Sequence, residues 1–264
     1  MAIFHIHNNF HLGDQIFNMI FFYNIKHFLQ RKGIHIRYYC PPEHLHQVIE
    51  FKSSNNVHIL PLSQKPPNSF LMWIENNKLK CTFQRVKNKY GKVRYNFFFI
   101  RFFNYILRDI FKSFIRLKKF YYHDINLLHR YENMEDKFKN VDILFLNSQP
   151  CSGQYDYNKG EWDNYIRDLH GKYKIVTTTH VEDYIPCTMH KDLTIKNIAA
   201  ISTHAKIIIA INSGVIPGCL NAYTLRNVRQ FYTFDRLCIY TYPNFRAMDN
   251  INQISHDELN RFIH

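Results

Sequence analysis

The sequence NNFHLGDQIFNMIFFYNI, residues 8–25, decides how the first half of the chain is interpreted. It follows the stretch AIFHIH at 2–7, whose alternation is typical of a strand, and residues 14–31 carry apolar side chains at helical spacing. Gly13 and Asp14 therefore stand where a predicted strand turns into a predicted helix. The chain has only eight glycines, so a glycine at this junction indicates either an unusual backbone conformation or the close approach of a ligand.

The same rhythm continues after this helix, which Gly33 is predicted to end. Residues 34–39 (IHIRYY) indicate a second strand, 41–51 (PPEHLHQVIEF) a short helix that starts with prolines, and 57–62 (VHILPL) a third strand. The succession βαβαβ predicts half of a doubly wound α/β sheet.

A second α/β region follows residue 138. Its predicted strands and helices are VDILFLN (141–147), KGEWDNYIRDLHGKY (159–173), KIVTTT (174–179), DLTIKNIAAISTHA (192–205), KIIIAIN (206–212), PGCLNAYTL (217–225) and RLCIYTYP (236–243). We therefore predict an α/β protein with two Rossmann-like domains, residues 1–138 and residues 139–264.

Positive charge is concentrated between Lys78 and Lys119. This segment holds thirteen Lys or Arg residues against one acidic residue, Asp109, in a chain with a net charge of +13. Residues 64–96 are polar and basic, which predicts loops and a hairpin rather than core. Residues 96–120 are apolar nearly all round with one narrow basic stripe, which predicts a long helix. This basic helical insertion (about 78–119) is expected either to be largely buried with its basic edge in water or to rest on an anionic membrane.

Composition places the chain among globular proteins, with 46% hydrophobic and 16% aromatic residues. Six cysteines are scattered without a C-x-x-C pair, so we expect free thiols and no zinc site. No N-terminal leader is visible, and no apolar run approaches the roughly 18 residues of a membrane span. We expect a cytoplasmic protein that contacts a membrane only peripherally.

The loop at 8–15 is a candidate site because ligands of α/β sheets bind at the carboxyl ends of the strands. Gly13 would permit a tight turn or the close approach of a substrate. Asp14 has two interpretations. It is either a helix N-cap, worth about 1 kcal/mol, or a carboxylate general base that deprotonates an acceptor hydroxyl.

The loop AINSGVIPGC at 210–219 is the second candidate. A β-branched strand ends there in Asn212-Ser213-Gly214, and Pro217 pre-sets the first turn of a helix. The loop is either a plain turn or an anion site, in which backbone N–H groups and a small hydroxyl hold a diphosphate.

Taken together, the two loops resemble a known pattern. HLGDQIFNMIFFYNI (11–25) resembles the N-terminal Gly-Asp loop and helix of the bacterial heptosyltransferase-like glycosyltransferases. DLTIKNIAAISTHAKIIIAINSG (192–214) is similar to their helix–strand–Asp-[Ser/Thr]-Gly signature, although Asn212 replaces the usual Asp and Pro217 a frequent His. The resemblance covers the beginning and the C-terminal third of the chain.

The resemblance implies a GT-B architecture, in which two Rossmann-like domains face each other across a cleft. The first domain would hold the acceptor and the second a nucleotide-sugar. Asp14 matches the catalytic base of the family, and Ser213 and Gly214 match its phosphate-contacting pair. Such enzymes invert the anomeric centre and need no metal or other cofactor, because a helix dipole and backbone amides stabilise the leaving diphosphate.

Further substrate contacts are expected around both loops. The stretch TTTHVEDYIP (177–186) ends a strand on the side of the second loop and could reach the base or ribose of a nucleotide. The substrate-binding residues that we predict are His11, Gly13, Thr179, His180, Glu182, Asn212, Ser213 and Gly214. Histidine pairs such as His5 and His7 lie at alternate strand positions and do not indicate a metal site.

The sequence therefore predicts a glycosyltransferase that moves a sugar from a nucleotide-sugar to a hydroxyl of a glycan or glycolipid. The alternative is a non-catalytic polyanion-binding protein, in which the basic and aromatic segment 78–121 binds nucleic acid. Confinement of the charge to one segment and the lack of a recognised nucleic-acid motif disfavour this alternative.

Overall fold

The chain divides into two compact units, Met1–Phe120 (unit 1) and Tyr121–His264 (unit 2). A computed structural model describes residues 2–75, 78–82, 85–87, 93–95, 121–151, 155, 157–189, 193–234 and 261. The predicted helix at 96–120 and the predicted strand at 236–243 lie outside the described residues.

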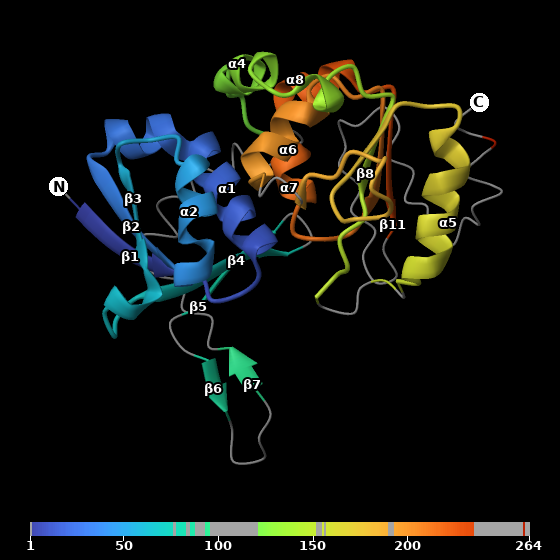
Figure 1. Cartoon of the computed structure of the whole chain (residues 1–264). Helices are drawn as coiled ribbons and strands as arrows, with labels where there is room; N and C mark the ends of the chain where they lie inside the picture. The colour runs from blue at the N-terminus through green and yellow to red at the C-terminus, as the bar shows by residue number, and fades with distance from the viewer. Residues whose placement is uncertain are drawn as a thin grey trace. The chain divides into compact units, whose positions relative to one another are not determined.

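Unit 1 is built around a five-stranded sheet (Figure 1). The strand order is β3-β2-β1-β4-β5, in which β5 runs antiparallel to β4 and the other neighbours are parallel. The elements are β1 Ala2–His7, α1 Leu12–Arg31, β2 Ile34–Cys40, α2 Pro42–Glu50, β3 Val57–Pro61, the 3₁₀ turn η1 Leu62–Gln64, β4 Phe70–Glu75 and β5 Lys78–Thr82. The predicted βαβαβ succession is confirmed. Gly33 takes a positive φ of 58° directly after α1, which ends the helix and turns the chain into β2.

The fourth strand corrects the sequence prediction for residues 64–96. Only loops and a hairpin were expected there, but β4 joins the parallel sheet beside β1. Its Leu71 and Met72 are buried, so this short apolar run belongs to the core. The strands β6 Arg85–Lys87 and β7 Val93–Tyr95 pair with each other in antiparallel fashion, as a hairpin requires.

Unit 2 contains a four-stranded parallel sheet in the order β11-β10-β8-β9. The elements are α4 Asn126–Glu132, η2 Asp136–Phe138, β8 Ile143–Leu146, α5 Lys159–His170, β9 Ile175–Thr177, α6 Ile195–Ser202, β10 Ile207–Ile211, α7 Ile216–Cys219, α8 Ala222–Asn227 and β11 Gln230–Phe234. The predicted strands at 141–147, 174–179 and 206–212 are confirmed. The strand β11 was not anticipated, because its sequence QFYTF carries no clear alternation.

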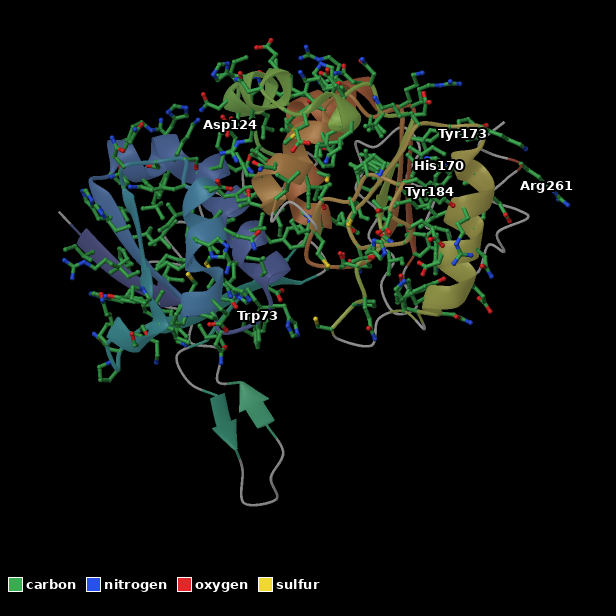
Figure 2. All side chains as sticks on the ribbon, in the orientation of Figure 1. Trp73, Asp124, His170, Tyr173, Tyr184 and Arg261 are labelled. Atoms are coloured by element: carbon green, nitrogen blue, oxygen red, sulfur yellow. The ribbon has the colours of Figure 1, made fainter. Side chains whose placement is uncertain are left out.

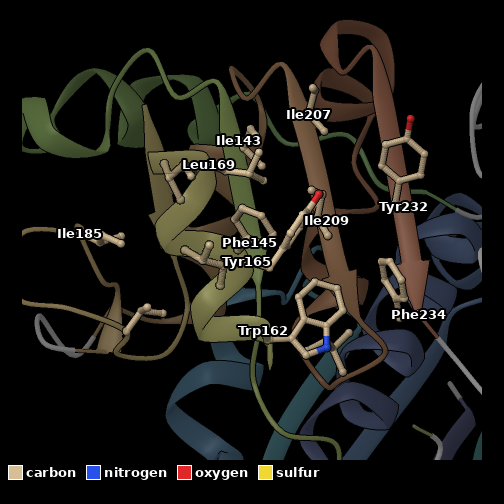
Figure 3. Close-up of a cluster of buried hydrophobic side chains, with 14 residues drawn as sticks. Ile143, Phe145, Trp162, Tyr165, Leu169, Ile185, Ile207, Ile209, Tyr232 and Phe234 are labelled. Carbon is tan, nitrogen blue, oxygen red and sulfur yellow. The ribbon is translucent and has the colours of Figure 1, made fainter. Parts of the chain in front are cut away.

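Side chains bury both faces of this sheet. On one face, Ile143 and Phe145 of β8 and the alternate residues of β10 pack against Trp162, Tyr165 and Leu169 of α5 (Figure 3). On the other face, the intervening strand residues pack against α6 and α7. This two-sided burial explains why β8 and β10 are apolar without interruption.

The division between the units falls before α4, whereas the sequence placed it near residue 138. The segment 121–138 is attached to unit 2 by several contacts. The backbone of Tyr122 bonds to Leu220 and Ala222, at 3.2 and 2.9 Å. Asp124, marked in Figure 2, accepts a hydrogen bond of 2.5 Å from the ammonium of Lys196 on α6. These partners lie about 70 to 100 residues away, and periodicity does not report contacts at such separations.

Candidate active site

In unit 1, the loop between β1 and α1 is held by the buried side chain of Asn8. Its Nδ2 donates to the carbonyl of Met72 on β4 at 2.8 Å. Its Oδ1 accepts from the backbone N–H of Phe10 at 2.7 Å and from Nε2 of Gln15 at 3.0 Å. The loop is therefore fixed both to the sheet and to the first turn of α1.

Two further polar side chains, Asn18 and Tyr38, extend this network beneath the loop. The Tyr38 hydroxyl donates to Oε1 of Gln15 at 2.5 Å and accepts from Nδ2 of Asn18 at 2.9 Å. Gln15, Asn18 and Tyr38 are fully buried, and burial holds the pKa of Tyr38 well above its usual range. Tyr38 therefore stays a neutral donor. A buried polar network of this kind specifies one conformation, because each unmade bond is costly.

Asp14 is the third residue of α1, and His11 occupies the N-cap position without a side-chain capping bond. The N-cap interpretation of Asp14 is therefore wrong, although a carboxylate in the first turn still suits the helix dipole. Asp14 is half-buried, and burial raises the pKa of its carboxyl, while the charge of His11 and the backbone N–H groups of His11 and Asp14 oppose this rise. A carboxyl with a raised pKa is a stronger base once it is ionised.

The other two predicted residues of this loop flank Asp14. His11 is exposed, whereas Gly13 is buried as the second residue of α1, so it lies within the helix and not in a tight turn. Unit 1 thus brings His11, Gly13 and Asp14 together on one helical turn that the Asn8 network holds in place.

In unit 2, the buried side chain of Asn147 joins the loops that follow β8 and β9. Its Oδ1 accepts from the backbone N–H groups of Thr178 and Thr179, both at 3.0 Å, and from the Thr178 hydroxyl at 3.2 Å. The Thr179 hydroxyl donates a hydrogen bond of 3.1 Å to the backbone carbonyl of Asn147. Thr179 is thereby fixed beside the end of β8. Sequence patterns did not single out Asn147, since an Asn after a strand is common in turns.

The predicted residues His180 and Glu182 follow in the same loop. The carbonyl of His180 accepts a hydrogen bond of 3.3 Å from Nζ of Lys159, the first residue of α5. Lys159 also pairs with Asp163. The carboxylate of Glu182 pairs with Arg167 at 2.6 Å, so it is already engaged by a cation. Lys159 adds a positive charge to this edge that the sequence prediction did not name.

The loop after β10 carries Asn212, Ser213 and Gly214. The backbone N–H of Asn212 bonds to Phe234 at the end of β11 at 2.9 Å, and the Ser213 carbonyl accepts from Ile216 at 3.3 Å. The Ser213 Oγ is shielded from solvent and has no hydrogen-bond partner among the described residues. The following helix α7 has only four residues, so its dipole is short.

The three loops of unit 2 lie at one edge of the sheet, because β10, β8 and β9 are parallel neighbours. Asn147, Thr179, His180, Lys159 and the Asn212–Gly214 turn therefore gather at the carboxyl ends of the strands, where such sheets bind ligands. Backbone N–H groups and hydroxyls at this edge suit a hydroxyl-rich ligand, and the Lys159 ammonium beside them is paired with Asp163.

The described residues show neither a metal-binding cluster nor a membrane-spanning helix. Across the described residues, no group of three or more His, Cys, Asp and Glu side chains is arranged to hold a metal ion. None of the helices in the described part of the chain has the length and apolar character that a membrane span requires. Four cysteines in the described ranges, Cys40, Cys151, Cys187 and Cys219, are free thiols.

Comparison with solved structures identifies the fold. The E. coli heptosyltransferase WaaC with ADP-2-deoxy-2-fluoro heptose matches with a TM-score of 0.53 and 9% identity, over 100% of this chain and 99% of that chain. The same enzyme with ADP matches with a TM-score of 0.51 and 9% identity, over 100% and 97%. The chain has a GT-B-type fold. No protein-family model and no curated protein sequence matches it.

The predicted fold class is confirmed by this similarity, which spans both units. The likeness to heptosyltransferases that the two motifs indicated is thus confirmed for the fold. A cleft between the units and the roles of the individual site residues stay predictions.

Proposed function

We propose that this protein transfers a sugar from a nucleotide-sugar donor to a hydroxyl of a glycan or glycolipid acceptor. The observation that carries the proposal is the GT-B-type fold, in which a half-buried carboxylate, Asp14, follows the carboxyl end of β1. The solved WaaC structures contain ADP or an ADP-heptose analogue, which supports a nucleotide-sugar as the donor class.

In the proposed reaction, Asp14 acts on the acceptor. Its carboxylate takes the proton of the acceptor hydroxyl while the oxygen attacks the anomeric carbon of the donor. The bond from this carbon to the diphosphate oxygen breaks, and the electron pair leaves with the nucleoside diphosphate. A single direct displacement inverts the anomeric centre. Burial of Asp14 supports this role, because it makes the ionised carboxylate more basic.

We assign the donor to the loop edge of unit 2. The buried Ser213 Oγ and the Gly214 amide would contact the diphosphate, and Lys159 would exchange its pairing with Asp163 for the diphosphate, whose negative charge it would offset without a metal. Thr179 and His180 would contact the nucleoside from the loop after β9. Asn212 would complete the turn that holds the diphosphate. Glu182, which is paired with Arg167, would contact the base or ribose of the nucleoside.

The acceptor is assigned to unit 1, where His11 and Gly13 flank Asp14. We further propose that the basic segment 78–119, which begins on β5, holds an anionic acceptor or contacts an anionic membrane surface from the cytoplasm. The two units would face each other across a cleft that brings donor and acceptor together.

Thermal-shift screening against nucleoside diphosphates and their sugars tests the donor assignment. We expect one nucleotide class to raise the melting temperature of the wild type. Ser213→Trp should abolish this rise by filling the proposed phosphate site. Ser63→Trp, the same substitution at an exposed residue of unit 1, should keep it. No shift with any nucleotide at millimolar concentration, in a protein that melts cooperatively, would contradict the assignment.

A further inference from the structure

Phe10 and Trp73 form a partly exposed aromatic pair in unit 1. Their ring centroids lie 5.9 Å apart and the rings are nearly perpendicular, at 88°. Phe10 belongs to the loop before α1, and Trp73 projects from β4, where Figure 2 marks it. Both side chains are only partly covered, whereas Met72 beside Trp73 is completely buried.

The strand register places this pair beside the loop that leads into the first turn of α1, which carries Asp14. The pairing of β1 with β4 ends at His7 opposite Leu71, so β4 continues past the end of β1 alongside the loop. The Met72 carbonyl accepts hydrogen bonds from Asn8 at 2.8 Å and from Asn18 at 3.0 Å. The residue before Trp73 is thus tied to both sides of the segment that carries Phe10 and Asp14.

The Asn8 side chain also fixes Phe10 directly. It accepts the Phe10 backbone N–H, and the Phe10 carbonyl accepts Nε2 of Gln15 at 3.1 Å. Aromatic rings that are held in place lose little conformational entropy when a ligand stacks on them. The pair is therefore a preorganised surface, in contrast to aromatic side chains on an unrestrained loop.

The chemistry of the surroundings favours a carbohydrate over a wholly apolar ligand. A pyranose ring has one apolar face, whose C–H bonds carry partial positive charge and are attracted to the negative face of an aromatic ring. Its hydroxyls need polar partners at the rim. The exposed His11 follows Phe10 in the chain, and the Asp14 carboxylate lies one helical turn further on.

We propose that Phe10 and Trp73 form a stacking platform for a sugar ring of the acceptor, which directs the attacking hydroxyl toward Asp14. This inference rests on the proposed glycosyl transfer and names the acceptor class, a glycan with a pyranose ring at its reactive end. Trp73 and Phe10 are positioning residues in this reaction.

Tryptophan fluorescence tests the platform independently of catalysis. The chain has two tryptophans, and Trp162 is buried in unit 2, so quenching by acrylamide reports mainly on Trp73. The probes are soluble oligosaccharides with and without phosphate groups. A glycan that binds should protect the wild-type protein from quenching, and the same glycan should produce no protection in Trp73→Phe.

Binding affinity supplies the second readout. Trp73→Ala should weaken glycan binding about tenfold, which corresponds to about 1.4 kcal/mol. Trp73→Phe keeps a ring and should lose less. Tyr23→Ala, which removes a partly exposed aromatic ring from the middle of α1, should bind as the wild type does. All three variants should keep the thermal shift with nucleotide, which shows that they are folded and that the donor assignment is unaffected.

Equal glycan affinity in wild type and Trp73→Ala, or unchanged quenching at saturating glycan, would overturn the platform while leaving glycosyl transfer intact. If no oligosaccharide binds the wild type, the platform proposal is also wrong. If no nucleotide raises the melting temperature of the wild type, this result would instead contradict the proposed function itself.

Discussion

Replacing Asn147 with alanine should destabilise unit 2 by removing the side chain that joins the loops after β8 and β9. Asn147 is 1% exposed, and its Oδ1 accepts two backbone N–H groups, from Thr178 and Thr179. Alanine leaves both donors without this acceptor. A buried polar group without a partner costs about 1–3 kcal/mol, and water can reach the partly exposed Thr179, so we expect a total loss of about 2–4 kcal/mol.

Urea denaturation followed by the fluorescence of Trp162 measures this loss, because Trp162 lies in the core of unit 2. A Trp73→Phe background makes Trp162 the sole tryptophan. The unfolding midpoint should fall by roughly 1 M. Asn147→Asp keeps an acceptor oxygen for both N–H groups and removes only the Nδ2 donor to the Thr179 carbonyl, so it should lose less stability than alanine does. Asn164→Ala, at an exposed position of α5, should stay within about 0.5 kcal/mol of the wild type. An Asn147→Ala protein as stable as Asn164→Ala would refute the reasoning.

Four other substitutions have defined outcomes. Asp124→Ala leaves the ammonium of Lys196, which is 6% exposed, without its carboxylate and should cost about 3–5 kcal/mol in chemical denaturation, whereas Lys196→Met should cost less; equal costs would contradict the buried-pair account. Burial alone would raise the pKa of Asp124, but Lys196 holds it below its usual range, so this stabilisation should be lost only as pH falls through that lowered pKa. Burial raises the pKa of Asp14, so folding favours its neutral carboxyl. The contribution of Asp14 to the stability of the folded state is therefore fully present below its unfolded pKa and is lost as pH rises through its folded pKa. Asp14→Asn should therefore be more stable than the wild type at pH 7 and equally stable at about pH 3. A variant less stable than the wild type at pH 7 would show that the Asp14 carboxylate has a structural role. Tyr38→Phe removes the donor to Gln15 in a fully buried network and should lower the free energy of unfolding by about 1–3 kcal/mol; no change in the denaturation midpoint would contradict a tight network.

Periodicity was sufficient for several local elements of the fold, although not for β4 and β11. The helix α1, which ends just before Gly33, and the continuously apolar strands β8 and β10 have patterns with one structural interpretation. By contrast, β4 is a short strand between polar and basic stretches, so its own sequence gives little pattern. Its burial depends on pairing with β1, which lies more than 60 residues earlier in the chain. The division before α4 also depended on distant partners, because Tyr122 and Asp124 bind residues of α6 and beyond.

The positions of the candidate site loops were predictable, because these loops follow the ends of predicted strands. The topology explains why the segments around Asp14, Thr179 and Ser213 stand at the carboxyl ends of strands. The sequence did not reveal what holds them. Asn8 and Asn147 act through bonds to residues 64 and 31 positions away, and an isolated Asn in a loop carries no signal of such bonds.

The most direct test of the central claim is a comparison of product formation by the wild type and Asp14→Asn. The nucleotide-sugar is the one that gives a thermal shift, and the acceptor is a glycan that binds. We expect the wild type to release nucleoside diphosphate and form the glycosylated product. Asp14→Asn should be slower by about 10²–10⁴-fold while its nucleotide-dependent thermal shift is unchanged. Equal rates in the two proteins would contradict Asp14 as the base, and no transfer by a wild type that binds both substrates would contradict glycosyl transfer.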